Sequence, residues 1–129
     1  MRHKWLLFFG VICLFQFCTT ASAQLMTSVK LREFCQNVSA DSSQMSNSQI
    51  DDAEKCLFYV AGVVDGYLVA SGTSRICLPK NGNVTYTQMA LIVSKYLNDH
   101  PEKLNNDPEY LILDALYGAF PCPLKPPNK

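Results

Sequence analysis

The sequence of 129 residues contains little histidine and no excess of charge of either sign. The 11 basic side chains balance the 11 acidic ones, and the only histidines are His3 and His100. Proteins that bind nucleic acid usually carry a basic patch, so the charge balance argues against nucleic acid as a partner. The sequence also lacks a glycine-rich phosphate loop, an H-E-x-x-H motif and an EF-hand loop. We therefore expect no cofactor.

The residues that could carry catalysis are few. Any Ser-His-Asp or Cys-His arrangement would have to use His100, which stands directly before Pro101 at an expected helix end. The cysteines are better explained as disulfides, because an oxidised sulfur cannot act as a nucleophile. The acidic pair Asp51 and Asp52 suits the solvated first turn of a helix. We therefore predict that the protein is not an enzyme and has no catalytic residues.

The beginning of the chain has the three-part layout of a secretory signal peptide. Basic residues near the start precede an apolar run over residues 5–17, and small residues occupy positions 21–23. The apolar run is shorter than the roughly 20 residues that a membrane-spanning helix needs. We expect a signal peptide over residues 1–23, cleavage after Ala23, and one exported domain over residues 24–129 without a membrane anchor.

Four cysteines follow the predicted cleavage site: Cys35, Cys56, Cys77 and Cys122. An even number in a short exported chain predicts two disulfides. A structural zinc site usually uses close pairs such as C-x-x-C, and these cysteines are widely spaced, so we predict no metal site. The sequence allows three pairings. We favour Cys35–Cys56 and Cys77–Cys122, because each pair joins neighbouring segments of the helical layout.

The hydrophobic pattern predicts four helices and no strand, and hence an all-α bundle of four main helices stapled by two disulfides. The first helix is expected over residues 28–36. Its predicted inward residues are Val29, Leu31, Phe34 and Cys35. Residues 37–49 are rich in Ser, Asn and Gln, a composition typical of a loop.

The second helix is the longest of the four. Ser48 and Asp51 form a pattern similar to a capping box at its start. Nearly every residue over 56–70 is apolar or small, and a helix that is apolar on all sides is normally central in a bundle. Gly62 and Gly66 each weaken a helix by about 1 kcal/mol, so we expect a neighbouring helix to pack closely on them.

The third and fourth helices have clear start signals. Thr85 is the expected cap of a helix over residues 86–99, with Gln88 as its capping-box partner. Its predicted core stripe is Met89, Ile92, Val93, Tyr96 and Leu97. The fourth helix is expected to begin with Asp107 as cap and Pro108 in its first turn. Its predicted inward residues are Leu111, Ile112, Ala115, Leu116 and Ala119.

Asp65 is the one charged residue inside the apolar stretch of the second predicted helix. An ionised carboxylate there needs a partner or a position open to solvent. Two explanations stay open. Asp65 either faces a gap between helices and bonds to a hydroxyl or backbone group, or it lies in a recognition surface beside Tyr59 or Tyr67.

Four motifs follow one another along the chain: CLFYVAGVVDG at residues 56–66, CLP at 77–79, YLNDHPE at 96–102 and ALYGAFPCP at 115–123. Together with the cysteines and the signal peptide, they resemble the Rap/Tai family of bacterial immunity proteins over about residues 31–123. The resemblance implies a small helical periplasmic protein that protects a Gram-negative cell from an effector delivered by type VI secretion. Several such effectors are peptidoglycan amidases, whose active-site cleft the immunity protein blocks. The resemblance also implies a possible homodimer.

A protein that plugs a cleft needs a rigid projecting element, because a pre-organised loop loses less entropy on binding. The loop over residues 73–84, which contains Cys77, is our first candidate for this element, and the loop over residues 98–107 is the second. The candidate partner-binding residues are Arg75, Lys80, Asn81 and Asp65.

A hypothesis from another class is a periplasmic acid-stress chaperone or a general protein-interaction module. Small helical disulfide proteins of that kind expose apolar surface when they are acidified. Melting and dye binding at neutral and strongly acidic pH would discriminate, since an immunity protein has no reason to open in acid.

Overall fold

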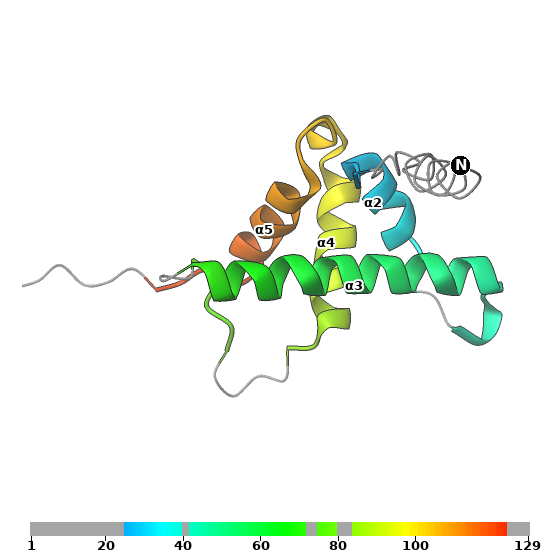
Figure 1. Ribbon diagram of the computed structural model, residues 1–129, viewed down its shortest axis with the longest axis horizontal. Helices are drawn as coiled ribbons and strands as arrows, with labels where there is room; N and C mark the ends of the chain where they lie inside the picture. The colour runs from blue at the N-terminus through cyan, green and yellow to red at the C-terminus, as the bar shows by residue number, and fades with distance from the viewer. Residues whose placement is uncertain (1–24, 40–41, 72–74, 80–83, 124–129) are drawn as a thin grey trace, which may run out of the picture.

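The computed structural model describes residues 25–39, 42–71, 75–79 and 84–123 (Figure 1). The described chain forms four α-helices and two 3-10 helices: α2 (Ser28–Cys35), η1 (Ser42–Gln44), α3 (Asn47–Ala70), α4 (Tyr86–Asp99), η2 (Pro101–Lys103) and α5 (Pro108–Ala119). It contains no strand apart from an isolated bridge between Ile76 and Pro121. The predicted all-α bundle is confirmed. The predicted signal peptide, Lys80 and Asn81 lie outside the described residues.

The long helix α3 runs along one side of the bundle (Figure 1). In this view α2 and α5 lie above α3, and α4 passes behind it. Every pair among the four helices is in contact, so they share one core. None of the described helices is both long and apolar enough to cross a membrane.

The core receives side chains from all four helices and from the segment after α3. Its buried members are Leu31, Cys35, Cys56, Val60, Val64, Ile76, Met89, Ala90, Val93, Leu97, Leu111, Ile112, Ala115 and Leu116. The predicted stripe of α4 is confirmed, with Ile92 and Tyr96 packed at the edge of the core.

The prediction that Val29 and Ala119 lie in the core is wrong. Val29 is exposed, because α2 meets the bundle along the narrow stripe of Leu31 and Cys35 and Val29 points to its other side. Ala119 is also exposed, since it is the last residue of α5 and lies beyond the turns that pack on α4.

The prediction that α3 is buried on all sides is wrong. Its buried residues are Cys56, Val60 and Val64, which form a single stripe at four-residue spacing. Phe58 is 70% exposed and Val69 is 88% exposed. The physical reason is that the other helices pack on one side of α3, which leaves its opposite side in solvent (Figure 1).

Among the described residues, no helix packs on Gly62 and Gly66, contrary to the sequence prediction. A Cβ atom added to either glycine meets no described atom within 4 Å apart from the backbone of α3 itself. Both glycines are exposed, on the side of α3 that the bundle leaves uncovered. Their cost to helix stability is therefore not offset by packing within the described bundle.

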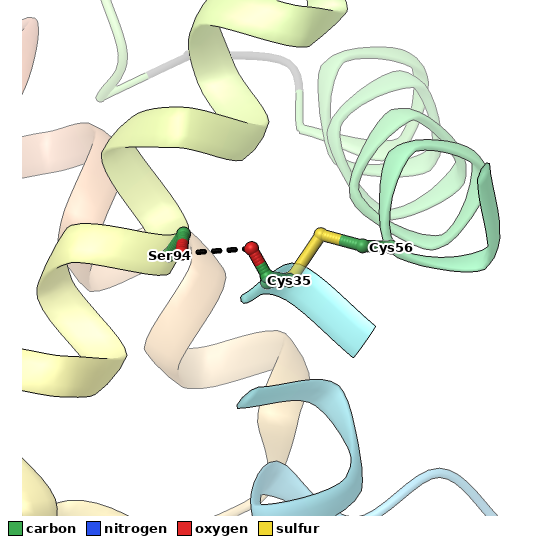
Figure 2. Close-up of a disulfide and its surroundings, with 3 residues drawn as sticks. All are labelled: Cys35, Cys56 and Ser94. Carbon is green, nitrogen blue, oxygen red and sulfur yellow. Dashed lines mark hydrogen bonds between the residues drawn. A yellow bond between two sulfur atoms is a disulfide. The ribbon is translucent and has the colours of Figure 1, made fainter. Parts of the chain in front are cut away.

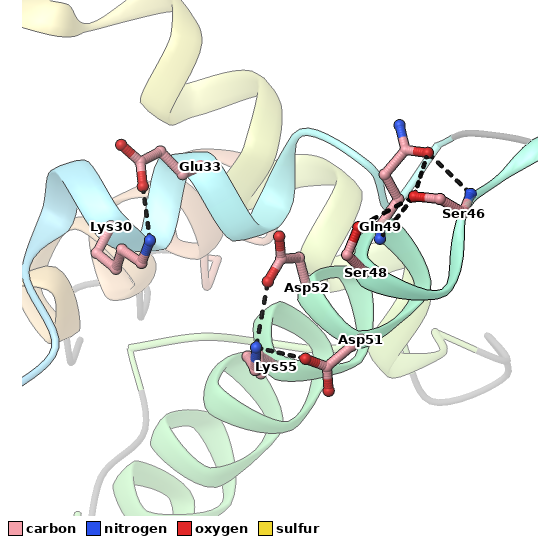
Figure 3. A network of polar contacts seen from close by, with 8 residues as sticks. All are labelled: Lys30, Glu33, Ser46, Ser48, Gln49, Asp51, Asp52 and Lys55. Carbon is pink, nitrogen blue, oxygen red and sulfur yellow. Dashed lines mark hydrogen bonds and ion pairs between the residues drawn. The ribbon is translucent and has the colours of Figure 1, made fainter.

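Ser46, and not Ser48, caps the start of α3 (Figure 3). The Ser46 side chain accepts from the backbone N–H of Gln49, and the Gln49 side chain accepts from the backbone N–H of Ser46 at 2.9 Å. The predicted Ser48–Asp51 capping pattern is thus two residues too late. Asp51 instead pairs with Lys55, whose Nζ lies 2.6 Å from the Asp51 Oδ2 atom.

Replacing Ser46 by alanine should lower the free energy of unfolding by about 1 kcal/mol, because the first turn of α3 loses its side-chain acceptor. Urea denaturation followed by circular dichroism measures the change. Ser48→Ala is the matched control, since the Ser48 hydroxyl contacts the Ser46 hydroxyl rather than a helix N–H. Equal losses in the two variants would contradict the assignment of the cap.

The starts of α4 and α5 lie at the predicted residues, and of the predicted capping box of α4 the bond to the Thr85 side chain is formed. The Thr85 side chain accepts from the backbone N–H of Gln88. Asp107 occupies the cap position of α5 without a side-chain cap bond, and Pro108 is the first helical residue. These boundaries fix the directions of the two helices that enclose most of the core.

The two disulfides pair as favoured. Cys35–Cys56 joins the end of α2 to α3 inside the core (Figure 2). The Ser94 hydroxyl of α4 donates to the carbonyl oxygen of Cys35 at 2.9 Å, so three helices meet at this point. Cys77–Cys122 joins the segment after α3 to the segment after α5 at the surface.

Candidate protein-binding surface

Residues 75–79, named here the anchored segment, belong to the first loop that the sequence indicated for partner binding. The Cys77–Cys122 disulfide joins this segment to the chain after α5. The backbone N–H of Cys77 donates to the carbonyl oxygen of Phe120 at 3.0 Å. The neighbouring Ile76 is buried in the core. These three links hold the base of the loop against the bundle.

Arg75 lies beside two tyrosines, and the three residues are named here the Arg75 cluster. The guanidinium stands over the ring of Tyr117, with 5.8 Å between Cζ and the ring centroid, which is within cation–π range. The backbone N–H of Arg75 donates to the Tyr67 hydroxyl at 3.2 Å. The Tyr67 and Tyr117 rings meet edge to face with centroids 6.0 Å apart. Arg75 is thus an exposed cation in a defined position, which suits a carboxylate of a partner protein.

The two tyrosines of the cluster have pKa values that move in opposite directions. The hydrogen bond with the Tyr117 side chain lowers the pKa of Tyr67, and the backbone N–H of Arg75 adds to this effect. Burial raises the pKa of Tyr117 to about 12, and its hydrogen bond to Tyr67 acts in the same direction. The two phenols therefore titrate as one coupled pair.

Replacing Tyr117 by phenylalanine should raise the pKa of Tyr67 toward its ordinary value, because the phenol that favours the Tyr67 anion is lost. Site-resolved NMR of labelled tyrosine through alkaline pH measures this pKa. Tyr110→Phe, at an exposed position of α5, is the control and should leave it unchanged. An unchanged Tyr67 pKa in Tyr117→Phe would show that the two phenols do not interact.

The same variant has a predictable effect on stability. The folded-state pKa of Tyr117 lies above the unfolded value of about 10, so its protonated form contributes stability that is present below that pH. This contribution is lost as the pH rises from about 10 through about 12. Urea denaturation at a series of pH values measures the free energy of unfolding. In Tyr117→Phe this free energy should fall less over that pH range than in the parent protein.

Asp65 is exposed and accepts a hydrogen bond from the Tyr86 hydroxyl at 2.7 Å. This bond links α3 to the first residue of α4 and raises the pKa of Tyr86. Tyr59, half-buried on α3, instead donates to Glu109 of α5. Asp65 therefore bonds to a hydroxyl, as the first explanation expected, but in solvent rather than in a gap between helices. A role for Asp65 in partner binding stays a prediction.

The second candidate loop, over residues 98–107, is also held to the bundle. The buried Ser28 hydroxyl donates to the carbonyl oxygen of Asn106 at 2.6 Å. Lys103 Nζ donates to the Tyr96 hydroxyl at 2.7 Å. The His100 ring packs against Tyr96 at a tilt of 46°, with ring centroids 4.5 Å apart, and its Nδ1 atom lies 3.1 Å from the Glu102 carboxylate. These contacts give His100 a place in a surface cluster with aromatic and acidic neighbours.

The prediction that Asp51 and Asp52 lie in the first turn of the helix is wrong, because α3 begins at Asn47 and its first turn contains no acidic residue. Both carboxylates instead form ion pairs in the second turn. Lys55 Nζ lies 2.6 Å from Asp51 and 3.2 Å from Asp52 (Figure 3). These side chains are partly or fully exposed, and such pairs contribute little to stability. Across the described residues, no group of three or more His, Cys, Asp or Glu side chains is arranged to hold a metal ion.

A second surface lies on the uncovered side of α3 and is named here the outer face. It comprises Phe58, Gly62, Asp65, Gly66 and Val69, which follow one another at helical spacing. All five residues are exposed. The sequence showed this apolar composition, but composition does not distinguish a buried helix from one with an uncovered face.

The described fold and surfaces define a class of protein. It is a small helical bundle with two disulfides that presents an arginine on an aromatic support and a separate apolar helix face, features that suit contact with another protein. The chain belongs to the family of Rap1a immunity proteins, whose profile matches residues 17–122. The match includes all four disulfide cysteines and confirms the family that the spaced motifs resembled. No curated protein sequence matches the chain.

Proposed function

We propose that the protein is a periplasmic immunity protein that binds a type VI secretion effector, a peptidoglycan amidase, and inhibits it by occluding its active site. Membership of an immunity family is the observation that carries this proposal. The secreted effector is the partner that such a family requires. The signal-peptide pattern of residues 1–23 supports export to the compartment in which the cell wall is attacked. The two disulfides suit the same oxidising compartment.

The Arg75 cluster supports the proposed mode of binding. Arginine and tyrosine are enriched among the residues that dominate binding energy at protein interfaces. Arg75 keeps its position through Tyr67, Tyr117 and the nearby Cys77–Cys122 disulfide. Less side-chain and backbone freedom is then lost when a partner docks. In this proposal Arg75 pairs with a carboxylate or carbonyl group at the rim of the effector's cleft.

A homodimer is part of the proposal, and the outer face of α3 supports it. If two copies of α3 pack antiparallel about a two-fold axis at Gly62, Phe58 of each copy faces Gly66 of the other. The large side chain then meets a position without a Cβ atom, so the surface is complementary to itself. Light scattering on the purified protein, with Phe58→Asp as the dissociating variant, measures the oligomeric state. A monomeric parent protein would remove the dimer from the proposal.

A growth assay tests immunity. If a peptidoglycan amidase is encoded next to this gene, that amidase, directed to the periplasm, should lyse host cells, and co-expression of the full chain should restore growth. Arg75→Glu should lose protection, because the reversed charge repels the carboxylate that Arg75 binds. Lys95→Glu, a charge reversal at an exposed position of α4, is the matched control and should still protect.

The outcomes separate the hypotheses. Lysis that the full chain does not prevent would contradict the immunity function. If Arg75→Glu still protects at normal protein levels, measured by immunoblot, the role of the Arg75 cluster is contradicted but the immunity function is not. Dye binding that increases sharply in acid, without protection, would favour the acid-stress chaperone.

A further inference from the structure

We propose that the Cys77–Cys122 disulfide is a redox switch, which a dithiol opens without unfolding the helical bundle and which releases the anchored segment when it opens. The consequence for effector binding rests on the function proposed above. The order in which the disulfides are reduced and the release of the anchored segment do not rest on that function, because they are properties of the isolated protein.

The two disulfides differ in their access to solvent. Cys35 and Cys56 are 1% and 0% exposed and belong to the core. Cys77 is exposed, and Cys122 is half-buried. Thiol–disulfide exchange requires a thiolate to reach one of the two sulfur atoms, so its rate depends on access. A dithiol therefore reaches Cys77–Cys122 through Cys77, while the packed helices shield Cys35–Cys56.

The bundle does not depend on the Cys77–Cys122 disulfide, named here the outer disulfide, for contact between its helices. Every pair among α2, α3, α4 and α5 packs directly, and Cys35–Cys56 separately joins α2 to α3. The outer disulfide connects two irregular segments that follow α3 and α5. Its reduction therefore removes a link between those segments and leaves the helical core in place.

The disulfide is the covalent link between the anchored segment and the chain after α5. After reduction the links that remain are noncovalent: the backbone bond from Cys77 to Phe120, the bridge between Ile76 and Pro121, and the packing of Ile76 and Leu78 on the core. Arg75 also keeps the bond from its backbone N–H to the Tyr67 hydroxyl. Noncovalent contacts open locally in solution, and Arg75 stands two residues before Cys77, so its position over Tyr117 is held less firmly once the disulfide is open. Reduction is therefore expected to loosen the Arg75 cluster while the helices stay packed.

The reaction balances with a dithiol as the reductant. One thiolate of the dithiol attacks the Cys77 sulfur, forms a mixed disulfide and displaces Cys122 as a thiolate, which takes up a proton. The second thiol then attacks the mixed disulfide and releases Cys77 as a thiol. Two electrons pass to the protein disulfide, and the dithiol becomes a disulfide. In the periplasm the matching reagent class is an oxidoreductase with an exposed dithiol.

Stepwise reduction of the purified protein tests the switch. Dithiothreitol is added in increasing amounts, free thiols are alkylated, and peptides are mapped by mass spectrometry, with circular dichroism recorded in parallel. Cys77 and Cys122 should be alkylated at least about tenfold faster than Cys35 and Cys56, with the helical signal retained. Hydrogen exchange should increase at residues 75–79 at the same step. Equal alkylation rates, or loss of helical signal together with the outer disulfide, would overturn the proposal.

A permanently open variant gives an independent test. Cys77→Ser combined with Cys122→Ser should keep the helical circular dichroism and show the fast exchange of the reduced segment. A variant that fails to fold would also overturn the proposal, since the bundle would then require this link. In the growth assay the folded variant should protect less than the parent. Full protection would refute the link to effector binding, whereas failure of the parent to protect would refute the proposed function and leave the reduction data valid.

Discussion

Replacing Cys35 and Cys56 together by alanine should lower the free energy of unfolding by about 3 kcal/mol. The disulfide spans 21 positions of sequence, and its loss restores the corresponding conformational freedom to the unfolded chain. Both sulfur atoms also fill part of the core, so their removal adds a packing loss to the entropic one. Urea denaturation under two-state conditions measures the total.

The same variant should release α2 before the rest of the bundle. This helix has eight residues, too few to be stable without tertiary contacts. Its end is held by the disulfide to α3 and by the bond from Ser94 to the Cys35 carbonyl. Hydrogen exchange should therefore lose protection first at α2. The double variant of Cys77 and Cys122 is the control, and in it the α2 amides should keep their protection. Intact α2 protection in the first variant would show that packing alone holds this helix.

Replacing Val64 by alanine should cost about 2 kcal/mol, whereas the same substitution at Val69 should change stability by less than about 0.5 kcal/mol when both are measured at protein concentrations low enough to keep the chain monomeric. Both valines lie on α3. Val64 is 1% exposed and Val69 is 88% exposed. Val64→Ala removes two methyl groups from a packed site and leaves a cavity. Val69→Ala loses almost no burial and gains helix propensity.

Urea denaturation of the two variants gives the comparison directly, since the chemistry of the substitution is identical. A similar loss at both positions would mean that the outer face is covered, for example by a second copy of the chain. Repeating the Val69→Ala measurement over a range of protein concentrations distinguishes these cases, because stability that comes from association depends on concentration.

The sequence predicted best where a signal is local. Thr85 and Pro108 mark the starts of α4 and α5, and His100 followed by Pro101 marks the end of α4. Such signals act through the backbone of the residues next to them, so they need no knowledge of the fold. The prediction of the α3 cap was wrong because it used only this local signal. Ser46 and Ser48 both satisfy the local pattern, and the structure uses Ser46.

The candidate surface was predictable only in part. The position of Arg75 in a loop near a cysteine indicated an exposed polar contact. The tyrosines that support it could not be identified, because Tyr67 and Tyr117 come from different helices and meet only after the chain folds. Likewise, the partner of Asp65 is a hydroxyl that lies 21 positions later in the chain.

The sequence by itself determined the helical class, the disulfide-bonded character and the family, because periodicity, cysteine spacing and ordered motifs are properties of the chain. The tertiary structure decided which side of α3 is covered, which disulfide is exposed and where Arg75 rests. These features depend on the way α2, α4 and α5 share one side of a longer helix. Apolar composition favours burial, but the number and length of the packing partners set how much of a helix is covered.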